Sequence, residues 1–303
     1  MKGASDSVSR LVRLARLEGE VDVRCLLAGS FALENPVAAP GSVPFHLVLA
    51  GRCTVTSGAT TVHLGPGDLA LLPHGDAHRV TATEGPRLAC EEEGGTAFPT
   101  RRTPGAEPQV DLFCGHYRFE RGAGALVFRL MPALVHVSLD SPALTLAEVL
   151  RGEAGFDGPG TRAIVAALLD ALLAMALRSR PEQRLDTPGL WTAAGDDALG
   201  RAVAGVVERP GEAWTIDRLA AAAGMSRATF QRRFTARTGT TVVALVTAIR
   251  MMVAAEQLTR SEHSVSRIAK EVGYRSESAF GQAFRAALGM SPARYRREAA
   301  ARR

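Results

Sequence analysis

The stretch Leu219-Ala-Ala-Ala-Ala-Gly-Met-Ser-Arg-Ala-Thr-Phe-Gln-Arg-Arg-Phe234 returns, with changes, as Ile268-Ala-Lys-Glu-Val-Gly-Tyr-Arg-Ser-Glu-Ser-Ala-Phe-Gly-Gln-Ala-Phe284. Each copy opens with an aliphatic-Ala pair and has a glycine five residues after the aliphatic residue. A polar turn follows, one residue longer in the second copy, and then Phe-x-x-x-Phe. The repeat predicts two pairs of short helices, each pair joined by a tight turn.

The punctuation of each copy supports this prediction. Gly224 and Gly273 stand where the first helix must end and the backbone needs a positive φ. Ser226 and Ser276 stand where an N-cap would begin the second helix. An alanine follows the aliphatic residue in both copies, which allows two helices to cross closely. Together these features are the signature of the helix-turn-helix.

The phenylalanines fix which side of each second helix faces inward. Phe230 and Phe234 are spaced i, i+4, so both point into the core, as do Phe280 and Phe284. The side chains that project away are candidates for reading DNA bases, because arginine and glutamine match guanine and adenine edges. The alternative is that they only solvate a surface helix. The candidates are Arg227, Ala228, Gln231, Arg232 and Thr235 in the first copy, and Glu277, Ser278, Ala279, Gly281, Gln282 and Arg285 in the second.

A helical segment separates the two copies. It covers 242–260, and at about 1.5 Å per residue it is roughly 28 Å long. This length suits two recognition helices on one face of a duplex, about one DNA turn (~34 Å) apart. Polar and basic residues beside these helices are candidates for phosphate contacts, which position a protein without specifying a sequence. They are Ser226, Arg250, Arg275, Ser276, Arg294 and Arg296.

The charge is distributed unevenly along the chain. Residues 196–303 hold 18 Lys/Arg and 10 Asp/Glu, a net +8, whereas residues 1–195 hold 18 and 21, a net −3. A basic C-terminal part on a mildly acidic body is typical of a module that binds a polyanion. A basic surface without a partner is the alternative. The sequence lacks the ~18 consecutive apolar residues of a membrane span, so we expect a cytoplasmic protein with no membrane partner.

The rest of the chain reads as strands and then helices. Short apolar or alternating runs between about Glu20 and Arg118 predict an antiparallel β-barrel or sandwich, with a polar loop at 91–109. Residues 145–178 read as helical, and 161–177 is apolar around most of its circumference, so it packs on the barrel or forms a homodimer interface. We therefore expect an α+β protein with three parts: a barrel with helices at 1–178, a linker at 179–195 and an all-α domain at 196–303.

The C-terminal residues resemble a known family. Gly273-Tyr274 through Phe280-x-x-x-Phe284, followed by Leu288-Gly-Met-Ser-Pro-Ala-Arg-Tyr-Arg296, is similar to the signature of the AraC/XylS family of bacterial regulators. The resemblance implies a double helix-turn-helix domain that binds double-stranded promoter DNA and usually activates transcription by contacting RNA polymerase. The second reading helix is less basic than the first, which predicts that the first carries most of the sequence discrimination.

The N-terminal part resembles a cupin. Gly67-Asp-Leu-Ala-Leu-Leu-Pro-His-Gly-Asp-Ala-His78 fits the second cupin motif, and Phe45-His-Leu-Val-Leu-Ala-Gly51 is similar to the end of the first. Residues 113–119 and 130–137 resemble the cupin-type sensor of one branch of AraC-like regulators. The resemblance implies a barrel that senses an effector and dimerises. Strand alternation would turn His46 to the side of His78, which makes both candidates for an effector pocket.

Three alternatives concern the signal. Two imidazoles fall short of the three or four ligands of a stable metal site, so we expect no metal at His46 and His78 and no cofactor. A metal-dependent cupin enzyme with a fused DNA-binding domain is the rival to our expectation of a protein that is not an enzyme. All four cysteines lie in the N-terminal part, so an oxidant could replace a small-molecule effector, with Cys25 and Cys90 as redox candidates, although the glutamates after Cys90 disfavour a thiolate there.

Overall fold

The computed structural model describes residues 17–119, 131–156, 158–178 and 196–301, together with Leu14, Leu126 and Phe128. The chain divides into two compact units. One comprises 17–118 and 132–178 of the described residues, and the other comprises 196–301, with which the few described residues before 17 and between 119 and 131 are grouped. The linker predicted at 179–195 lies outside the described residues.

The N-terminal unit is built from two β-sheets. The larger contains β1 (Leu17–Leu27), β3 (Ser42–Ala50), β6 (Asp68–Leu71), β8 (Glu91–Glu93), β9 (Thr100–Arg102), β10 (Val110–Phe119) and β11 (Val135–Ser138), in the order β11-β6-β3-β10-β1-β9-β8. The smaller contains β2 (Phe31–Asn35), β4 (Cys53–Ser57), β5 (Thr60–Leu64) and β7 (His78–Ala82), in the order β2-β7-β4-β5. Buried side chains from both sheets, such as Val48 and Val80, form one core.

This arrangement refines the expected barrel. The described strands form two separate sheets, and no ladder among them closes the sheets into one barrel. The larger sheet is also not wholly antiparallel, because β1 pairs with β9 in parallel. β8 and β9 lie inside the segment expected to be a loop. Ion pairs between Arg101 and Glu92 and between Arg102 and Glu93 link them across the ladder. The sequence pattern does not predict these two strands, because their residues are charged rather than apolar.

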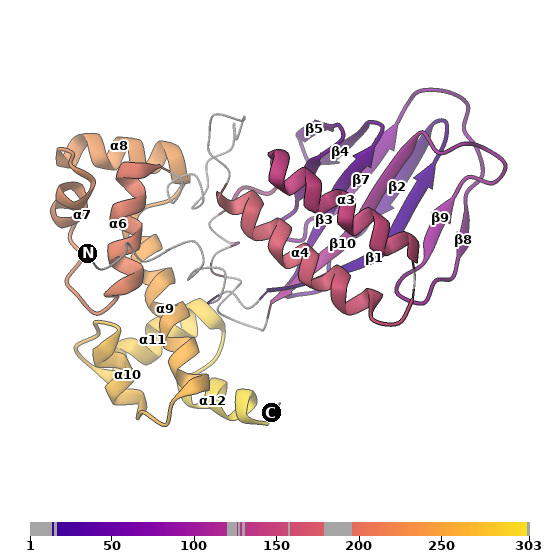
Figure 1. Ribbon diagram of the computed structural model, residues 1–303. Coiled ribbons are helices and arrows are strands. Elements are labelled where there is room, and N and C mark those ends of the chain that lie inside the picture. The colour runs from indigo at the N-terminus through magenta and orange to yellow at the C-terminus, as the bar shows by residue number, and fades with distance from the viewer. Residues whose placement is uncertain are drawn as a thin grey trace. The chain divides into compact units, whose positions relative to one another are not determined.

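Two helices pack against the larger sheet (Figure 1). They are α3 (Ser141–Phe156), which contacts β3, and α4 (Thr161–Arg178), which contacts β1 and α3. α4 approaches β1 very closely, because a Cβ at Gly19 would lie 2.6 Å from the Cβ of Leu169. Its buried residues include Val165, Leu169 and Leu173, whereas Ile164 is exposed. The apolar character of this helix is thus explained first by packing within its own unit.

The C-terminal unit is helical. It contains α6 (Asp197–Glu208), α7 (Ile216–Ala223), α8 (Arg227–Thr238), α9 (Val242–Arg260), α10 (Val265–Glu271), α11 (Glu277–Leu288) and α12 (Pro292–Ala300). α9 has the bounds expected for the connecting helix, and it touches α6, α8, α10, α11 and α12. Its mean hydropathy of 1.5 and its 19 residues would suit a membrane span, but 61% of it is buried within the protein. We interpret it as the core helix of this unit.

Candidate nucleic-acid interface

The first helix pair, α7 and α8, has the geometry that the sequence predicts. Gly224 ends α7 with φ 69°, and the Ser226 hydroxyl accepts a hydrogen bond from the backbone N–H of Thr229. Phe230 and Phe234 are almost completely buried. The remaining face of α8 is exposed at Arg227, Ala228, Gln231, Arg232 and Thr235. The five candidates of this copy therefore lie on the surface of one helix.

The second pair, α10 and α11, repeats this arrangement. Gly273 has φ 88°, and the Ser276 hydroxyl accepts from the N–H of Ala279. Phe280 and Phe284 are completely buried. The candidates Glu277, Ser278, Ala279, Gln282 and Arg285 are exposed, and Gly281 is half-buried.

A half-buried arginine, Arg250, connects the two helix pairs. Arg250 Nε donates to the carbonyl of Pro210 and its Nη2 donates to that of Glu212, both at 2.8 Å. The Arg250 guanidinium also lies over the Tyr274 ring, 6.0 Å from its centroid. A Cβ at Gly273 would come within 2.8 Å of Arg250 Nη2, so this glycine provides space as well as its backbone conformation. Arg250 thus joins α9, the loop before α7 and the turn before α11.

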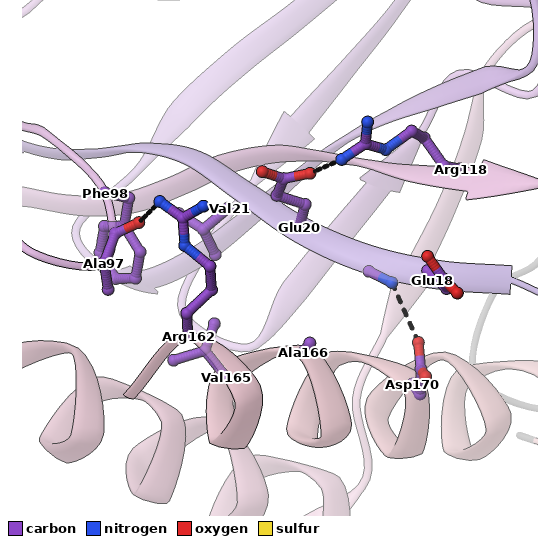
Figure 2. A pocket seen from close by; sticks show the side chains of 11 residues that line it. Glu18, Glu20, Val21, Ala97, Phe98, Arg118, Arg162, Val165, Ala166 and Asp170 are labelled. Atoms are coloured by element: carbon purple, nitrogen blue, oxygen red, sulfur yellow. Dashed lines mark hydrogen bonds and ion pairs between the residues drawn. The ribbon is translucent and has the colours of Figure 1, made fainter. Parts of the chain in front are cut away.

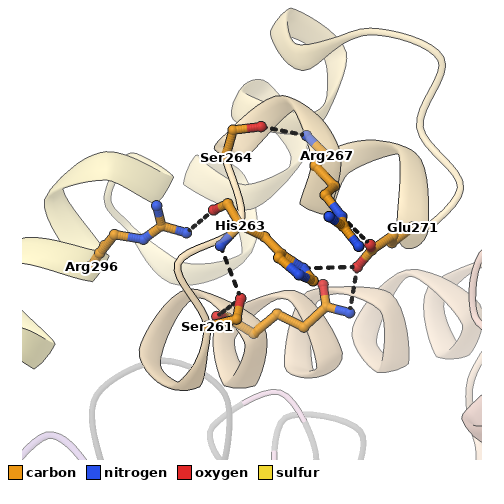
Figure 3. Close-up of polar contacts among 7 residues, drawn as sticks. Ser261, His263, Ser264, Arg267, Glu271 and Arg296 are labelled. Carbon is orange, nitrogen blue, oxygen red and sulfur yellow. Dashed lines mark hydrogen bonds and ion pairs between the residues drawn. The ribbon is translucent and has the colours of Figure 1, made fainter.

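Glu271, at the end of α10, is the centre of a polar network that holds the second pair (Figure 3). Its carboxylate accepts from Arg267 Nε at 2.8 Å and from Gln257 Nε2 at 3.0 Å, and it lies 3.6 Å from His263 Nδ1. The hydrogen bond from Arg267 is the main reason that the pKa of Glu271 is lowered. Arg296 Nη2 donates to the carbonyl of His263 at 2.5 Å. The network connects α9, α10 and α12.

The phosphate candidates fall into two groups. The guanidinium groups of Arg250 and Arg296 donate hydrogen bonds to backbone carbonyls. Both arginines therefore have a structural role that the sequence alone does not indicate. Arg294 is exposed and pairs with Glu298 in the next turn of its own helix. Ser226, Arg275 and Ser276 are exposed beside the two turns. This second group is exposed, although the Ser226 and Ser276 hydroxyls also cap their helices.

In the N-terminal unit, His46 and His78 belong to a buried chain of polar side chains. His78 Nδ1 lies 2.9 Å from the carbonyl of Asp76, so it must donate, since a carbonyl only accepts. His78 Nε2 then accepts from His46 Nε2 at 2.7 Å, and His46 Nδ1 accepts from the Cys114 thiol at 3.2 Å. Burial, with the neighbouring His78, lowers the pKa of His46 to about 3. Both rings are therefore neutral donors and acceptors in a core.

The donor set beside these histidines is small. Among the described residues, no group of three or more His, Cys, Asp or Glu side chains is placed to hold a metal ion. Cys114 contacts the far nitrogen of His46 rather than the point where the two Nε2 atoms meet. A metal at that point would have two protein ligands.

The cysteines differ in exposure. Cys25, Cys53 and Cys114 are buried, whereas Cys90 is exposed. Cys25 and Cys114 belong to the same buried core, and the neighbouring Cys114 side chain is the main reason that the pKa of Cys25 is lowered. Burial raises the pKa of Cys53 to about 12. The two redox candidates thus lie in very different environments.

A cavity of about 290 Å³ lies between β1 and α4 (Figure 2). Its apolar wall includes Val21, Phe98 and Val165. Arg162 stands at one end, where it donates to the carbonyl of Ala97 at 2.8 Å, and Asp170 accepts from the N–H of Gly19 at the other. Sequence reasoning missed this cavity, because its lining residues come from four distant segments.

Comparison with known proteins gives matches along nearly the whole chain. Residues 6–180 match the family described as a cupin, and residues 219–298 match a helix-turn-helix domain. The regulator MtrA of Neisseria gonorrhoeae is 32% identical over 97% of this chain and 98% of its own, and an uncharacterized HTH-type regulator of Haemophilus influenzae is 31% identical over 96% and 98%. RclR of Escherichia coli, an RCS-specific HTH-type transcriptional activator, is 27% identical over 96% and 97%.

These matches agree with the geometry of both units. The cupin match covers the two-sheet unit with α3 and α4, and the helix-turn-helix match spans from α7 into α12. The relatives are matched over almost their full length. The chain therefore belongs to the AraC-like family of HTH-type transcriptional regulators, with an N-terminal cupin domain and a C-terminal DNA-binding domain.

Proposed function

We propose that this protein is a sequence-specific regulator that reads two neighbouring major grooves with α8 and α11. The observation that carries the proposal is the pair of phenylalanine-anchored helices with exposed polar faces, joined within one unit by α9 and Arg250. α9 is 19 residues long, or roughly 28 Å at about 1.5 Å per residue. That is close to the ~34 Å turn of DNA that separates two half-sites.

The contacts divide into reading and positioning. Arg232 and Gln231 have exposed side chains suited to guanine and adenine edges. Positioning contacts with phosphates come from Ser226, Arg275, Ser276 and Arg294, beside the turns and on α12. We leave Arg250 and Arg296 out of this set, because their guanidinium groups already hold helices together.

Footprinting on a selected binding site tests this function. With the full chain on a site chosen from a randomised duplex library, hydroxyl-radical cleavage should be protected in two patches about one helical turn apart (~34 Å) on one face. Arg232→Ala should weaken one patch, while Arg87→Ala, an exposed arginine of the cupin domain, should leave both unchanged. A single protected patch in the wild type would contradict the two-groove arrangement.

The cupin domain, we propose, receives the signal. The cavity beside α4 favours a small-molecule effector, since α4 is the last described element before the chain continues to α6. Candidate effectors can be screened by the rise in melting temperature of the full chain. Ala166→Leu, which would place a larger side chain in the lining of the cavity, should abolish the rise. Gly94→Ala, at an exposed position where a Cβ would meet nothing within 4 Å among the described residues, should keep it.

An oxidant is the second candidate signal, and it is favoured by two free cysteines, Cys25 and Cys114, that share one buried core. Cys25→Ser should then abolish the transcriptional response to oxidant, and Cys90→Ser tests the exposed thiol. An unchanged response in both variants would remove this candidate. Metal analysis of the purified protein decides the enzyme alternative, since stoichiometric iron, manganese or zinc would support it.

Activation, polymerase contact and dimerisation complete the proposal. The name of RclR describes an activator, and we propose the same sign of regulation here, in the cytoplasm and through RNA polymerase.

Exposed apolar side chains on α3 and α4, namely Val149, Phe156 and Ile164, favour a homodimer. Transcription from a template with the selected site should rise on addition of the protein, and sedimentation should give twice the chain mass.

A further inference from the structure

The reading face of α11 differs in chemistry from that of α8. α8 contains four arginines and no acidic residue, whereas α11 contains one arginine, Arg285, and one glutamate, Glu277. Within residues 196–301, Glu277 is exposed and has no ion-pair partner. A bare carboxylate repels a phosphate backbone. A glutamate at the start of a reading helix therefore weakens DNA binding unless it meets a positive or donating group on the DNA.

The bases offer such a group in the major groove. Cytosine presents its N4 amino group and adenine its N6 amino group, and glutamate accepts a hydrogen bond from cytosine N4. Residues at the N-terminus of a recognition helix are the ones that reach base edges, and Glu277 is the first residue of α11. Gln282, further along the exposed face, suits adenine N6 and N7.

Gly281 allows the close approach that short side chains require. It lies four residues after Glu277, on the same side of α11. A Cβ at this position would meet nothing within 4 Å in the part of the chain that the structure describes, so packing there does not require a glycine. A glycine inside a helix costs about 1 kcal/mol relative to alanine. No contact of Gly281 with the described residues offsets this cost, whereas a close approach to DNA would.

Resting on the proposed two-groove function, we infer that α11 recognises a half-site of base amino groups. Glu277 accepts from a cytosine N4, Gln282 pairs with an adenine, and Gly281 lets the helix backbone approach the bases. The arginines of α8 select guanine in the other half-site. The operator is thus asymmetric in chemistry as well as in sequence.

Selection of binding sites from a randomised duplex library, with the full chain, tests the inference. The wild type should prefer cytosine by about tenfold or more at one position of the α11 half-site, the discrimination of one good base contact. Glu277→Gln should move this preference to adenine, and Glu277→Ala should reduce it below about threefold, with the α8 half-site unchanged. Glu262→Gln, the same charge change on an exposed loop residue before α10, should keep the wild-type site.

The outcomes separate this inference from the function on which it rests. If Arg232→Ala alters one half-site while Glu277→Gln and Glu277→Ala select the wild-type sequence in the other, the inference is overturned and the two-groove function stands. If Glu262→Gln changes the cytosine preference as Glu277→Gln does, bulk charge explains the effect and the inference also fails. If the wild type enriches no sequence, both proposals fail.

Discussion

α8 and α11 are built alike on the inside and differently on the outside. Both begin at a serine N-cap, bury two phenylalanines four residues apart and end at a glycine with positive φ. Outside, α8 has four arginines, whereas α11 has Glu277, Gly281 and a single arginine. The buried faces pack in the same way in both pairs, while the proposed function assigns the exposed faces to contact with DNA. The two helices therefore differ on the faces that the proposed function assigns to DNA recognition.

The largest change in stability should come from substitutions on the buried faces, which are alike in the two helices. Phe230→Ala and Phe280→Ala each remove a completely buried ring, which costs about 3–5 kcal/mol of unfolding free energy. Urea unfolding of the full chain, followed by circular dichroism, should give similar losses for the two variants. A loss confined to one of them would show that the two helix pairs are not equivalent cores.

Substitutions of exposed side chains should reduce DNA affinity more in α8 than in α11. Arg232→Ala should reduce affinity for the selected site by about 1–3 kcal/mol, the worth of a bidentate base contact, and Gln282→Ala should reduce it less, because α11 is the less basic helix. Fluorescence anisotropy at one fixed salt concentration measures both, with Arg87→Ala as the matched control. An equal or larger loss for Gln282→Ala would contradict the idea that α8 dominates discrimination.

Asp196 links α6 to α8 of the first helix pair. Its carboxylate caps α6 and pairs with Arg233 of α8 at 2.5 Å. Burial raises its pKa, but backbone N–H groups of Leu199 and Ala198, with Arg233, lower the net value. Since a depressed carboxyl pKa stabilises the fold above the unfolded value near 3.9, Asp196→Asn should cost about 1 kcal/mol at pH 7.

The pH dependence of that variant gives the control. The difference between wild type and Asp196→Asn should shrink as the pH falls below about 4, because the carboxyl of the unfolded chain then takes up a proton while the native one, whose pKa is lower, stays ionised. The contribution of the charge is lost once the pH falls below the native pKa. Urea midpoints between pH 7 and pH 3 measure it. A difference that stays constant over this range would mean that the charge of Asp196 contributes nothing. Gln282→Ala, at an exposed position of α11 in the second pair, should show no such trend.

The smallest effect should be a gain in stability. Gly281→Ala should raise the unfolding free energy by up to about 1 kcal/mol and yet weaken binding to the selected site. Gly152→Ala is the matched control, because Gly152 lies in α3 and a Cβ there also meets nothing within 4 Å. That variant should gain stability with unchanged DNA affinity. A Gly281→Ala protein that binds DNA as well as the wild type would contradict the proposal that Gly281 lets the α11 backbone approach the bases.

Sequence reasoning reached most of the helical domain. The caps at Ser226 and Ser276, the glycine turns, the four phenylalanines and the bounds of α9 were all predicted, and they are confirmed. The sequence predicts less of the cupin domain. It indicates a loop where β8 and β9 lie, and it does not indicate the cavity beside α4. Those features depend on charges and surfaces that meet across the sheet.

The sequence by itself determined the two helix pairs, because helix period, caps and glycine turns are set by residues within four positions of one another. Only the tertiary structure decided that Arg250 binds carbonyls 38 and 40 residues away and that His46 donates to His78 while accepting from Cys114. Such partners are chosen by how strands and helices pack, and packing brings together residues whose separation along the chain carries no periodic signal.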